Sequence, residues 1–226
     1  MSEKTIYITT ENEFLRPYIK REMGKTEPSF SVMVSSTDIY VPDAEALITE
    51  DGATDESSPW AAYERQFINE YPDGIILRAA PIAGTGMTGK IRRLAEEIHG
   101  ARFFHFPANE ARKSIVHASD VAKVVAILAK DGVPDGSGRI FNICDGEDPT
   151  LHDIAEALAY RMGNKRISTL STKPQQMIGR LLYGKRYGYY ISDERFNGLA
   201  LCEATGFRPV SVCEYLRTHV YDENSL

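Results

Sequence analysis

The sequence predicts an α/β fold built on a mainly parallel sheet. Short β-rich segments alternate with segments of helical periodicity along the chain, which is typical of this class. Residues 74–78 read Gly-Ile-Ile-Leu-Arg, and their apolar run is the pattern of a strand covered on both faces. The chain has 226 residues, of which 42% are hydrophobic and 26% charged, so one domain with a small lobe can bury a substantial core.

The first elements follow in order. Residues 5–9 are β-rich and predict a strand, and apolar residues recur at helical spacing over 13–23 until Gly24. Residues 31–34 predict the next strand. We expect it to lie parallel and directly beside the first, because a short right-handed crossover joins neighbouring strands most easily.

The remaining elements continue the alternation. An acidic, polar surface loop is expected over 42–58, a helix over 59–71 and a flexible glycine-rich loop over 84–89. Further strands are predicted over 74–78, 101–106, 114–117 and 139–143. Further helices are predicted over 90–99, from 120, and over 150–162, 193–205 and 213–220. Thr150 with Asp153 three residues later has the spacing of a capping box at a helix start.

One stretch indicates more than a fold class. Residues 31–40 read Ser-Val-Met-Val-Ser-Ser-Thr-Asp-Ile-Tyr, and Pro59 opens a helix about twenty positions later. This order resembles the catalytic stretch of the NAD-dependent epimerase/dehydratase family, the extended short-chain dehydrogenases/reductases. In that family a strand ends in Ser-Ser-x-x-Val-Tyr, and a Tyr-x-x-x-Lys helix follows. Here Trp60 takes the place of the Tyr and Glu64 the place of the Lys.

Four further segments, 75–84, 112–121, 141–147 and 193–209, are similar to family motifs in the same order. The resemblance implies a truncated Rossmann-like, mainly parallel sheet with a small C-terminal substrate-lobe remnant. We expect a single truncated domain over 1–226, with the Rossmann-like core in 1–150 and mostly the C-terminal lobe in 151–226.

The dinucleotide-binding half of the family does not match. A dinucleotide needs a glycine-rich turn at a helix N-terminus, where backbone N–H groups meet the pyrophosphate. No glycine occurs before Gly24, and Glu11 and Glu13 bring negative charge to that turn. Only one strand and one helix precede the Ser-bearing strand, where relatives carry about four such units. The strand and helix over 5–23 correspond either to the first strand–helix unit of the family, with the next three deleted, or to the unit directly before the Ser-bearing strand.

The catalytic positions are also altered. A hydride-transfer site needs a phenol made acidic by a nearby ammonium, whereas Trp60 has no titratable proton and Glu64 would raise a phenol's pKa. We therefore assign no catalytic residue and treat Ser36, Trp60 and Glu64 as degenerate positions.

Several residues are candidates for binding a ligand. The hydroxyls of Ser35, Ser36 and Thr37 either bind a ligand or satisfy nearby backbone groups. Arg78, in the strand similar to the family's Arg-Pro segment, is a further candidate. Arg112 matches a family Arg that contacts the diphosphate of a nucleotide-sugar; the alternatives are a surface ion pair or no particular role.

Composition restricts the partners. A net charge of −6 argues against a general nucleic-acid or membrane binder. Three cysteines without CxxC spacing indicate reduced thiols and no metal framework. The sequence has no apolar run of about 18 residues and no visible leader, so we expect a cytoplasmic protein.

His117 and Asp120 would suggest a metal site or an acid/base pair if they were considered without their neighbours. The resemblance instead implies that Asp120 is a helix cap and His117 a packing residue.

Two functions stay open. The first is a non-catalytic relative that binds a small ligand, possibly a nucleotide-sugar, or a protein partner, with no cofactor. The second is an active NAD- or NADP-dependent nucleotide-sugar epimerase, dehydratase or reductase with an atypical site. We also expect a homodimer, because Trp60, Tyr63, Phe67 and Tyr71 give the helix over 59–71 much aromatic surface. In relatives this helix and the one before the Ser-bearing strand form a four-helix interface.

Overall fold

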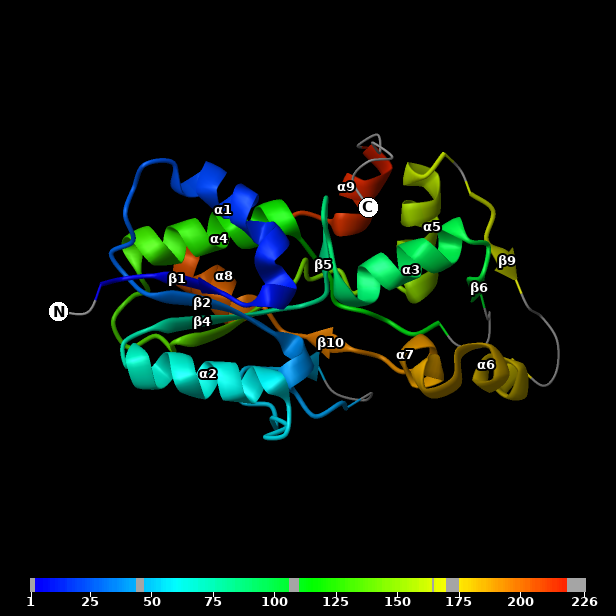
Figure 1. Cartoon of the computed structure of the whole chain (residues 1–226), viewed down its shortest axis with the longest axis horizontal. Coiled ribbons are helices and arrows are strands. Elements are labelled where there is room, and N and C mark those ends of the chain that lie inside the picture. Colours follow the sequence, from blue (N-terminus) through cyan, green and yellow to red (C-terminus); the bar gives the residue numbers. More distant parts are fainter. Residues whose placement is uncertain (1–2, 44–46, 106–109, 164, 170–174, 219–226) are drawn as a thin grey trace.

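The computed structural model describes residues 3–43, 47–105, 110–163, 165–169 and 175–218. Its centre is a four-stranded parallel sheet in the order β1-β2-β4-β8 (Figure 1). The strands are β1 (Ile6–Ile8), β2 (Val32–Ser36), β4 (Ile75–Ala79) and β8 (Ile140–Ile143). Ile6 pairs with Val32 in register, which confirms that the first strand lies parallel and directly beside the Ser-bearing strand.

The two faces of the sheet are covered by different helices. Figure 1 shows α1 (Arg16–Met23) and α4 (Ala118–Asp131) above the strands and α2 (Pro59–Glu70) below them. Side chains of a strand alternate between faces, and the packing follows this rule. Val32 and Val34 join the core formed with α1 and α4, whereas Met33 packs on Phe67 of α2.

This arrangement gives the two N-terminal crossovers opposite hands. The connections β1-α1-β2 and β2-α2-β4 step in the same direction across the sheet, yet their helices cover opposite faces. One of them is therefore left-handed, the uncommon form for parallel strands. The right-handed rule predicted the correct neighbour for β1 but does not hold for both connections.

The opposite placement of α1 and α2 limits which helices the expected dimer interface could contain. A single two-fold interface cannot contain both helices when the sheet lies between them. Phe67 is only 2% exposed, because it packs on Met33, Ile76 and Tyr7 within the same chain. The aromatic surface expected on this helix is thus partly used inside the monomer, and dimerisation through α2 stays a prediction.

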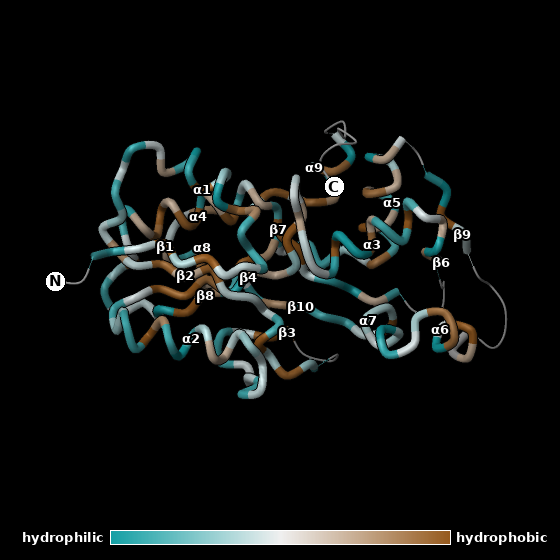
Figure 2. Tube along the Cα trace, in the orientation of Figure 1, coloured by the Kyte–Doolittle hydropathy of each residue, from teal (hydrophilic) through white to brown (hydrophobic). Residues whose placement is uncertain are grey.

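A second hydrophobic core forms the other half of the molecule (Figure 1). Its helices are α3 (Gly89–His99), α5 (Leu151–Arg161), α6 (Gln175–Tyr183), α7 (Tyr187–Ile191) and α9 (Val212–Thr218). The capping box that begins α5 is present, with Thr150 and Asp153 bonded reciprocally. Figure 2 shows hydrophobic stretches along the central strands and α4, which mark the first core.

Short strand pairs lie outside the central sheet. They are β3 (Leu47–Ile48) with β10 (Arg195–Phe196), β5 (Ile82–Ala83) with β7 (Val116–His117), and β6 (Phe104–His105) with β9 (Ser168–Thr169). The 3-10 helices η1 (Thr10–Leu15), η2 (Thr37–Ile39) and η3 (Gly184–Arg186) and the helix α8 (Leu199–Thr205) complete the described elements. Residue 106 of the expected strand and residues 219 and 220 of the expected last helix lie outside the described residues.

Three predicted elements differ from the structure. The acidic loop contains β3, because Ile48 is buried at 8% exposure and pairs with Phe196. The helix expected from residue 193 starts only at Leu199, because the N–H and C=O of Glu194 bond to Arg112 and Ser114 and hold this segment extended. The cap of α4 is His117, whose Nδ1 accepts the N–H of Ser119, and not Asp120.

Candidate functional site

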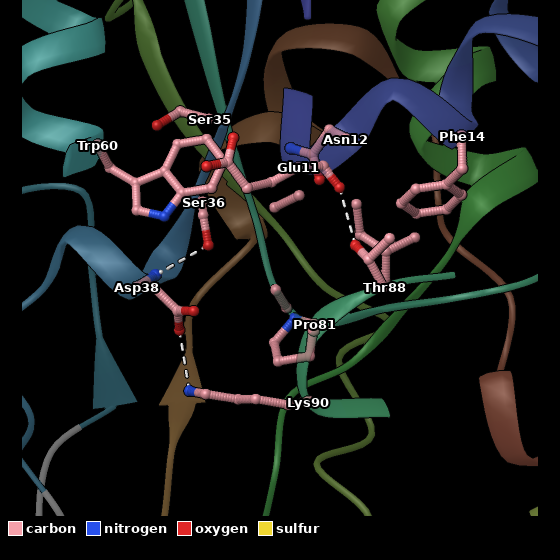
Figure 3. A pocket seen from close by; sticks show the side chains of 14 residues that line it. Glu11, Asn12, Phe14, Ser35, Ser36, Asp38, Trp60, Pro81, Thr88 and Lys90 are labelled. Atoms are coloured by element: carbon pink, nitrogen blue, oxygen red, sulfur yellow. Dashed lines mark hydrogen bonds and ion pairs between the residues drawn. The ribbon is translucent and has the colours of Figure 1, made fainter. Parts of the chain in front are cut away.

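A cavity of about 240 Å³ lies at the carboxyl ends of β2 and β4. Ligands of open parallel sheets bind at this end of the strands. Figure 3 shows the residues around it, which come from η1, the end of β2, the start of α2, and the loops before β5 and α3. The lining comprises Glu11, Asn12, Phe14, Ser35, Ser36, Asp38, Trp60, Ala79, Ala80, Pro81, Ile82, Thr88, Gly89 and Lys90.

Ser36 ends β2 and caps the short helix η2. Its Oγ accepts the N–H of Asp38 at 3.1 Å, so the hydroxyl can still donate one hydrogen bond toward the cavity. The Asp38 carboxylate in turn lies 2.9 Å from Lys90 Nζ, which also contacts Glu194 at 2.8 Å. Burial lowers the pKa of Lys90, but these two carboxylates outweigh it and the pKa is raised. The cavity therefore contains a fixed ammonium beside a carboxylate.

Trp60 presents its indole to the cavity from the first turn of α2 (Figure 3). Ser58 caps this helix by accepting the N–H of Trp60 at 3.4 Å. The ring is half-buried and meets Tyr63 edge-on, with 5.9 Å between the ring centroids. An aromatic surface thus stands where the family motif would place a phenol.

Glu64 lies one turn further along α2 and is buried at 5% exposure. Its Oε1 accepts hydrogen bonds from Ser35 Oγ at 2.7 Å and from Arg78 Nε at 3.0 Å, and its Oε2 accepts one from Arg78 Nη2 at 2.8 Å. Arg78 therefore binds the carboxylate with two parallel bonds. Ser35 and Arg78 hold Glu64 in place, so the residue that the sequence resemblance aligns with the Lys is an anchor within the core.

Tyr40 extends this buried network. Arg78 Nη1 donates to the Tyr40 oxygen at 3.0 Å, and the Tyr40 hydroxyl donates to Asn142 Oδ1 at 2.8 Å. Its phenol lies next to a cation, as a catalytic phenol would. However, burial raises its pKa, and the residue is only 4% exposed. Tyr40 is thus shielded from the cavity, and it does not line it.

The other ligand candidates lie elsewhere. Thr37 is 2% exposed and borders a neighbouring cavity of about 220 Å³, which shares Asp38 and Lys90 with the first. Arg112 is exposed: its N–H donates to Asp193, and its Nη1 donates to the carbonyl of Asp148 at 3.1 Å. The cavity thus brings Ser35, Ser36 and Trp60 together, while Arg78 lies behind them and Arg112 is not part of its lining.

Sequence reasoning missed four polar residues of the lining: Asn12, Asp38, Thr88 and Lys90. Asp38 lies inside the stretch used for the family resemblance. Lys90 follows the glycine-rich loop at the start of α3, which is the one signal that could have marked it.

The turn after β1 does not fit a dinucleotide. It forms the 3-10 helix η1, and the N–H of Asn12 bonds within the turn to the carbonyl of Thr9 at 3.0 Å. Glu11 and Glu13 lie in its first turn, and Glu11 borders the cavity. A pyrophosphate here would meet the Glu11 carboxylate in a turn without glycine, whereas Glu13 lies outside the cavity lining and pairs with Arg16.

The described ranges contain neither a metal cluster nor a membrane-spanning helix. No group of three or more His, Cys, Asp or Glu side chains there is arranged to hold a metal ion. None of the described helices is long and apolar enough to cross a membrane.

Comparisons with known proteins place the fold. No family model and no curated protein matches the chain by sequence. Among solved structures, a UDP-glucose 4-epimerase with UDP-glucose from Thermotoga maritima matches 88% of this chain at 18% identity, with a TM-score of 0.57. The human epimerase family protein SDR39U1 with NADPH matches 92% at 13% identity, with a TM-score of 0.60. A UDP-N-acetylglucosamine 4-epimerase from Bacillus cereus matches 92% at 16% identity, with a TM-score of 0.58.

These likenesses confirm the fold that the sequence motifs implied, a Rossmann-like α/β fold of the epimerase/dehydratase type. The chain is shorter than the proteins it matches: it spans 64% of the Thermotoga enzyme, 73% of the human protein and 67% of the Bacillus enzyme.

Proposed function

We propose that this protein is a non-catalytic relative of the nucleotide-sugar epimerases and dehydratases, and that its cavity binds the sugar moiety of a nucleotide-sugar. The observation that carries the proposal is the state of the two catalytic positions. Trp60 offers no proton, and Glu64 is held by Arg78 and Ser35 inside the core. No acid/base pair of the family type faces the cavity.

The cavity itself supports binding of a small, hydroxyl-rich ring. Trp60 and Phe14 supply aromatic surface, and Asn12, Ser36 and Asp38 supply hydrogen-bonding groups around it. A few oriented polar groups beside aromatic walls are typical of small-molecule sites. The volume of about 240 Å³ lies below the roughly 300–1,000 Å³ of sites for drug-sized ligands, so the cavity suits one ring better than a dinucleotide.

The solved relatives support this ligand class. The Thermotoga enzyme was solved with UDP-glucose, and another structure of this fold, called MoeE5, with UDP-glucose and NAD. The same comparison motivates the competing function, an active enzyme that uses NAD or NADP through an atypical site. The carboxylates of η1 count against that alternative.

Trp60 provides the test, because it is the single Trp of the chain and lines the cavity. Titration with UDP-glucose should change its fluorescence in a saturable way. Substituting Trp60→Phe should abolish the signal, and calorimetry on Trp60→Ala should show roughly tenfold weaker binding, about 1.4 kcal/mol. The matched control is Ile68→Ala, on the exposed side of α2, which should bind as the native protein does. Unchanged fluorescence and no heat up to millimolar UDP-glucose would refute a nucleotide-sugar ligand.

A further inference from the structure

The outer edge of β1 is uncovered. β1 is the last strand on its side of the sheet order, and among the described residues no strand pairs with its free side. The solved structures with this fold are longer chains, of which this one spans 64–73% in the three cases above. An edge strand with open N–H and C=O groups is a template for pairing with another strand.

The register between β1 and β2 shows which backbone N–H and C=O groups of β1 point away from β2. The N–H of Val32 donates to the carbonyl of Thr5 at 2.9 Å, and Ile6 lies in register with Val32. In a parallel pair, alternate residues of a strand bond to the same neighbour. Thr5 and Tyr7 therefore face β2, while Ile6 and Ile8 direct their N–H and C=O groups outward.

A groove of about 530 Å³ runs along this edge between β1 and α1. Its floor is apolar and includes Ile6, Ile8, Ile19 and Met23, the last two of which are 5% and 7% exposed. The hydrophobic core of the sheet thus reaches the surface beside the free backbone groups. The rim carries both signs of charge, with Glu3, Lys4, Arg16, Lys20 and Glu27.

We propose that the β1 edge is a homodimer interface, in which β1 of a second copy pairs with it antiparallel about a two-fold axis near Tyr7. The edge is self-complementary in this arrangement. Ile6 of one copy then faces Ile8 of the other, so both outward N–H groups and both carbonyls find partners. Directly opposite residues of an antiparallel pair share a face. The isoleucines therefore cover the groove on the α1 side, and the two Tyr7 rings meet on the α2 side.

The charged side chains on the rim of the groove also favour a second copy of this chain as the partner. The rim has two carboxylates, two ammonium groups and the Arg16 guanidinium, which already pairs with Glu13. A copy rotated by a two-fold axis can bring the remaining opposite charges together. An interface of this kind is isologous and closes at two subunits, which also removes the exposed sheet edge. It is independent of the ligand proposed above and differs from the α2 interface expected from the sequence.

Light scattering at high micromolar concentration tests the proposal on the native protein, with an expected mass about twice 25.3 kDa. The substitution Ile6→Pro removes an outward N–H and leaves the Tyr7 bonds to β2 intact, as an edge strand tolerates. It should give the monomer mass with a native circular dichroism spectrum. The matched control Ile68→Ser, on the exposed face of α2, should stay dimeric. A monomeric native protein, or a dimer lost in Ile68→Ser and kept in Ile6→Pro, would overturn the proposal.

Amide hydrogen exchange on the native protein tests the same interface without the Ile6→Pro variant, so the result does not depend on whether that variant folds. The Tyr7 amide faces β2 and should be protected at every protein concentration, so it serves as an internal reference. The Ile6 and Ile8 amides should exchange slowly at high concentration and at least tenfold faster on dilution to the monomer. Fast exchange of both amides at all concentrations would contradict the pairing.

Discussion

Arg78 binds Glu64 through two hydrogen bonds of 3.0 and 2.8 Å, with both side chains 6% exposed. Neither residue could remain buried alone, because an unpaired charge in the core is strongly destabilising. Burial lowers the pKa of Arg78, but the Glu64 carboxylate more than compensates and raises it. The Glu64 carboxylate thus has a structural partner in Arg78 of β4, and this ion pair joins α2 to the sheet.

Breaking this pair should be costly. Glu64→Gln leaves the Arg78 charge buried without its partner, and we expect a loss of about 3–5 kcal/mol in the free energy of unfolding. Urea denaturation measures it. The double substitution Glu64→Met with Arg78→Met removes both charges and should be more stable than the single variant. A loss below about 1 kcal/mol for Glu64→Gln would show that the pair contributes little.

Restoring the family residues should not restore the site. Glu64→Lys places an ammonium against the Arg78 guanidinium, so the variant Trp60→Tyr with Glu64→Lys should unfold at lower urea than Glu64→Gln. We also expect no NAD-dependent turnover of UDP-glucose by that double variant, measured by product analysis. The control Trp60→Tyr alone should fold normally, because it leaves the ion pair unchanged. Turnover by the double variant would contradict this account of the site.

Lys113 predicts a pH dependence of stability. It is 1% exposed, donates to the Ser192 carbonyl at 2.6 Å and lies 4.2 Å above the Tyr189 ring. Burial lowers its pKa to about 8, against the opposing effect of Glu194. Between pH 8 and the unfolded value of about 10.4, the unfolded chain binds more protons than the folded one, so this group makes stability rise with pH in that window.

Urea denaturation between pH 7.5 and 10 measures this effect as a difference between two proteins. Lys113→Met removes the titrating group, so the native protein should gain stability relative to the variant as the pH rises. Well below pH 8 both states of the native protein hold the proton, so the difference should level off toward the acidic end of this range. A difference that stays constant up to pH 10 would place the pKa of Lys113 near its ordinary value.

Much of the fold was readable from sequence because its signals are local. Apolar runs marked β2 and β4, and Thr150 with Asp153 marked the start of α5, since a capping box needs only residues three apart. The left-handed crossover and β3 could not be predicted, because both depend on which distant segments pair. Local spacing likewise suggested a helix from residue 193, whereas bonds to Arg112 and Ser114 hold that segment extended.

The site was less predictable, although one signal was available. Ala61, Glu64 and Phe67 recur every three residues on the buried side of α2, and Arg78 interrupts an apolar strand. A charged residue among buried apolar positions requires an opposite charge nearby. This rule alone would have predicted from the sequence that Glu64 pairs with Arg78. Asp38 and Lys90 come together from η2 and α3, 52 positions apart, and no local pattern reports that contact.

The proposed function depends most directly on whether the protein binds a sugar nucleotide without a dinucleotide. Isothermal titration calorimetry of the native protein with NAD, NADP and UDP-glucose, each to millimolar concentration, separates the alternatives. Our account predicts heat of binding for UDP-glucose alone and none for NAD or NADP, because the turn after β1 has no glycine and places Glu11 beside the cavity. Micromolar affinity for NAD or NADP would contradict it.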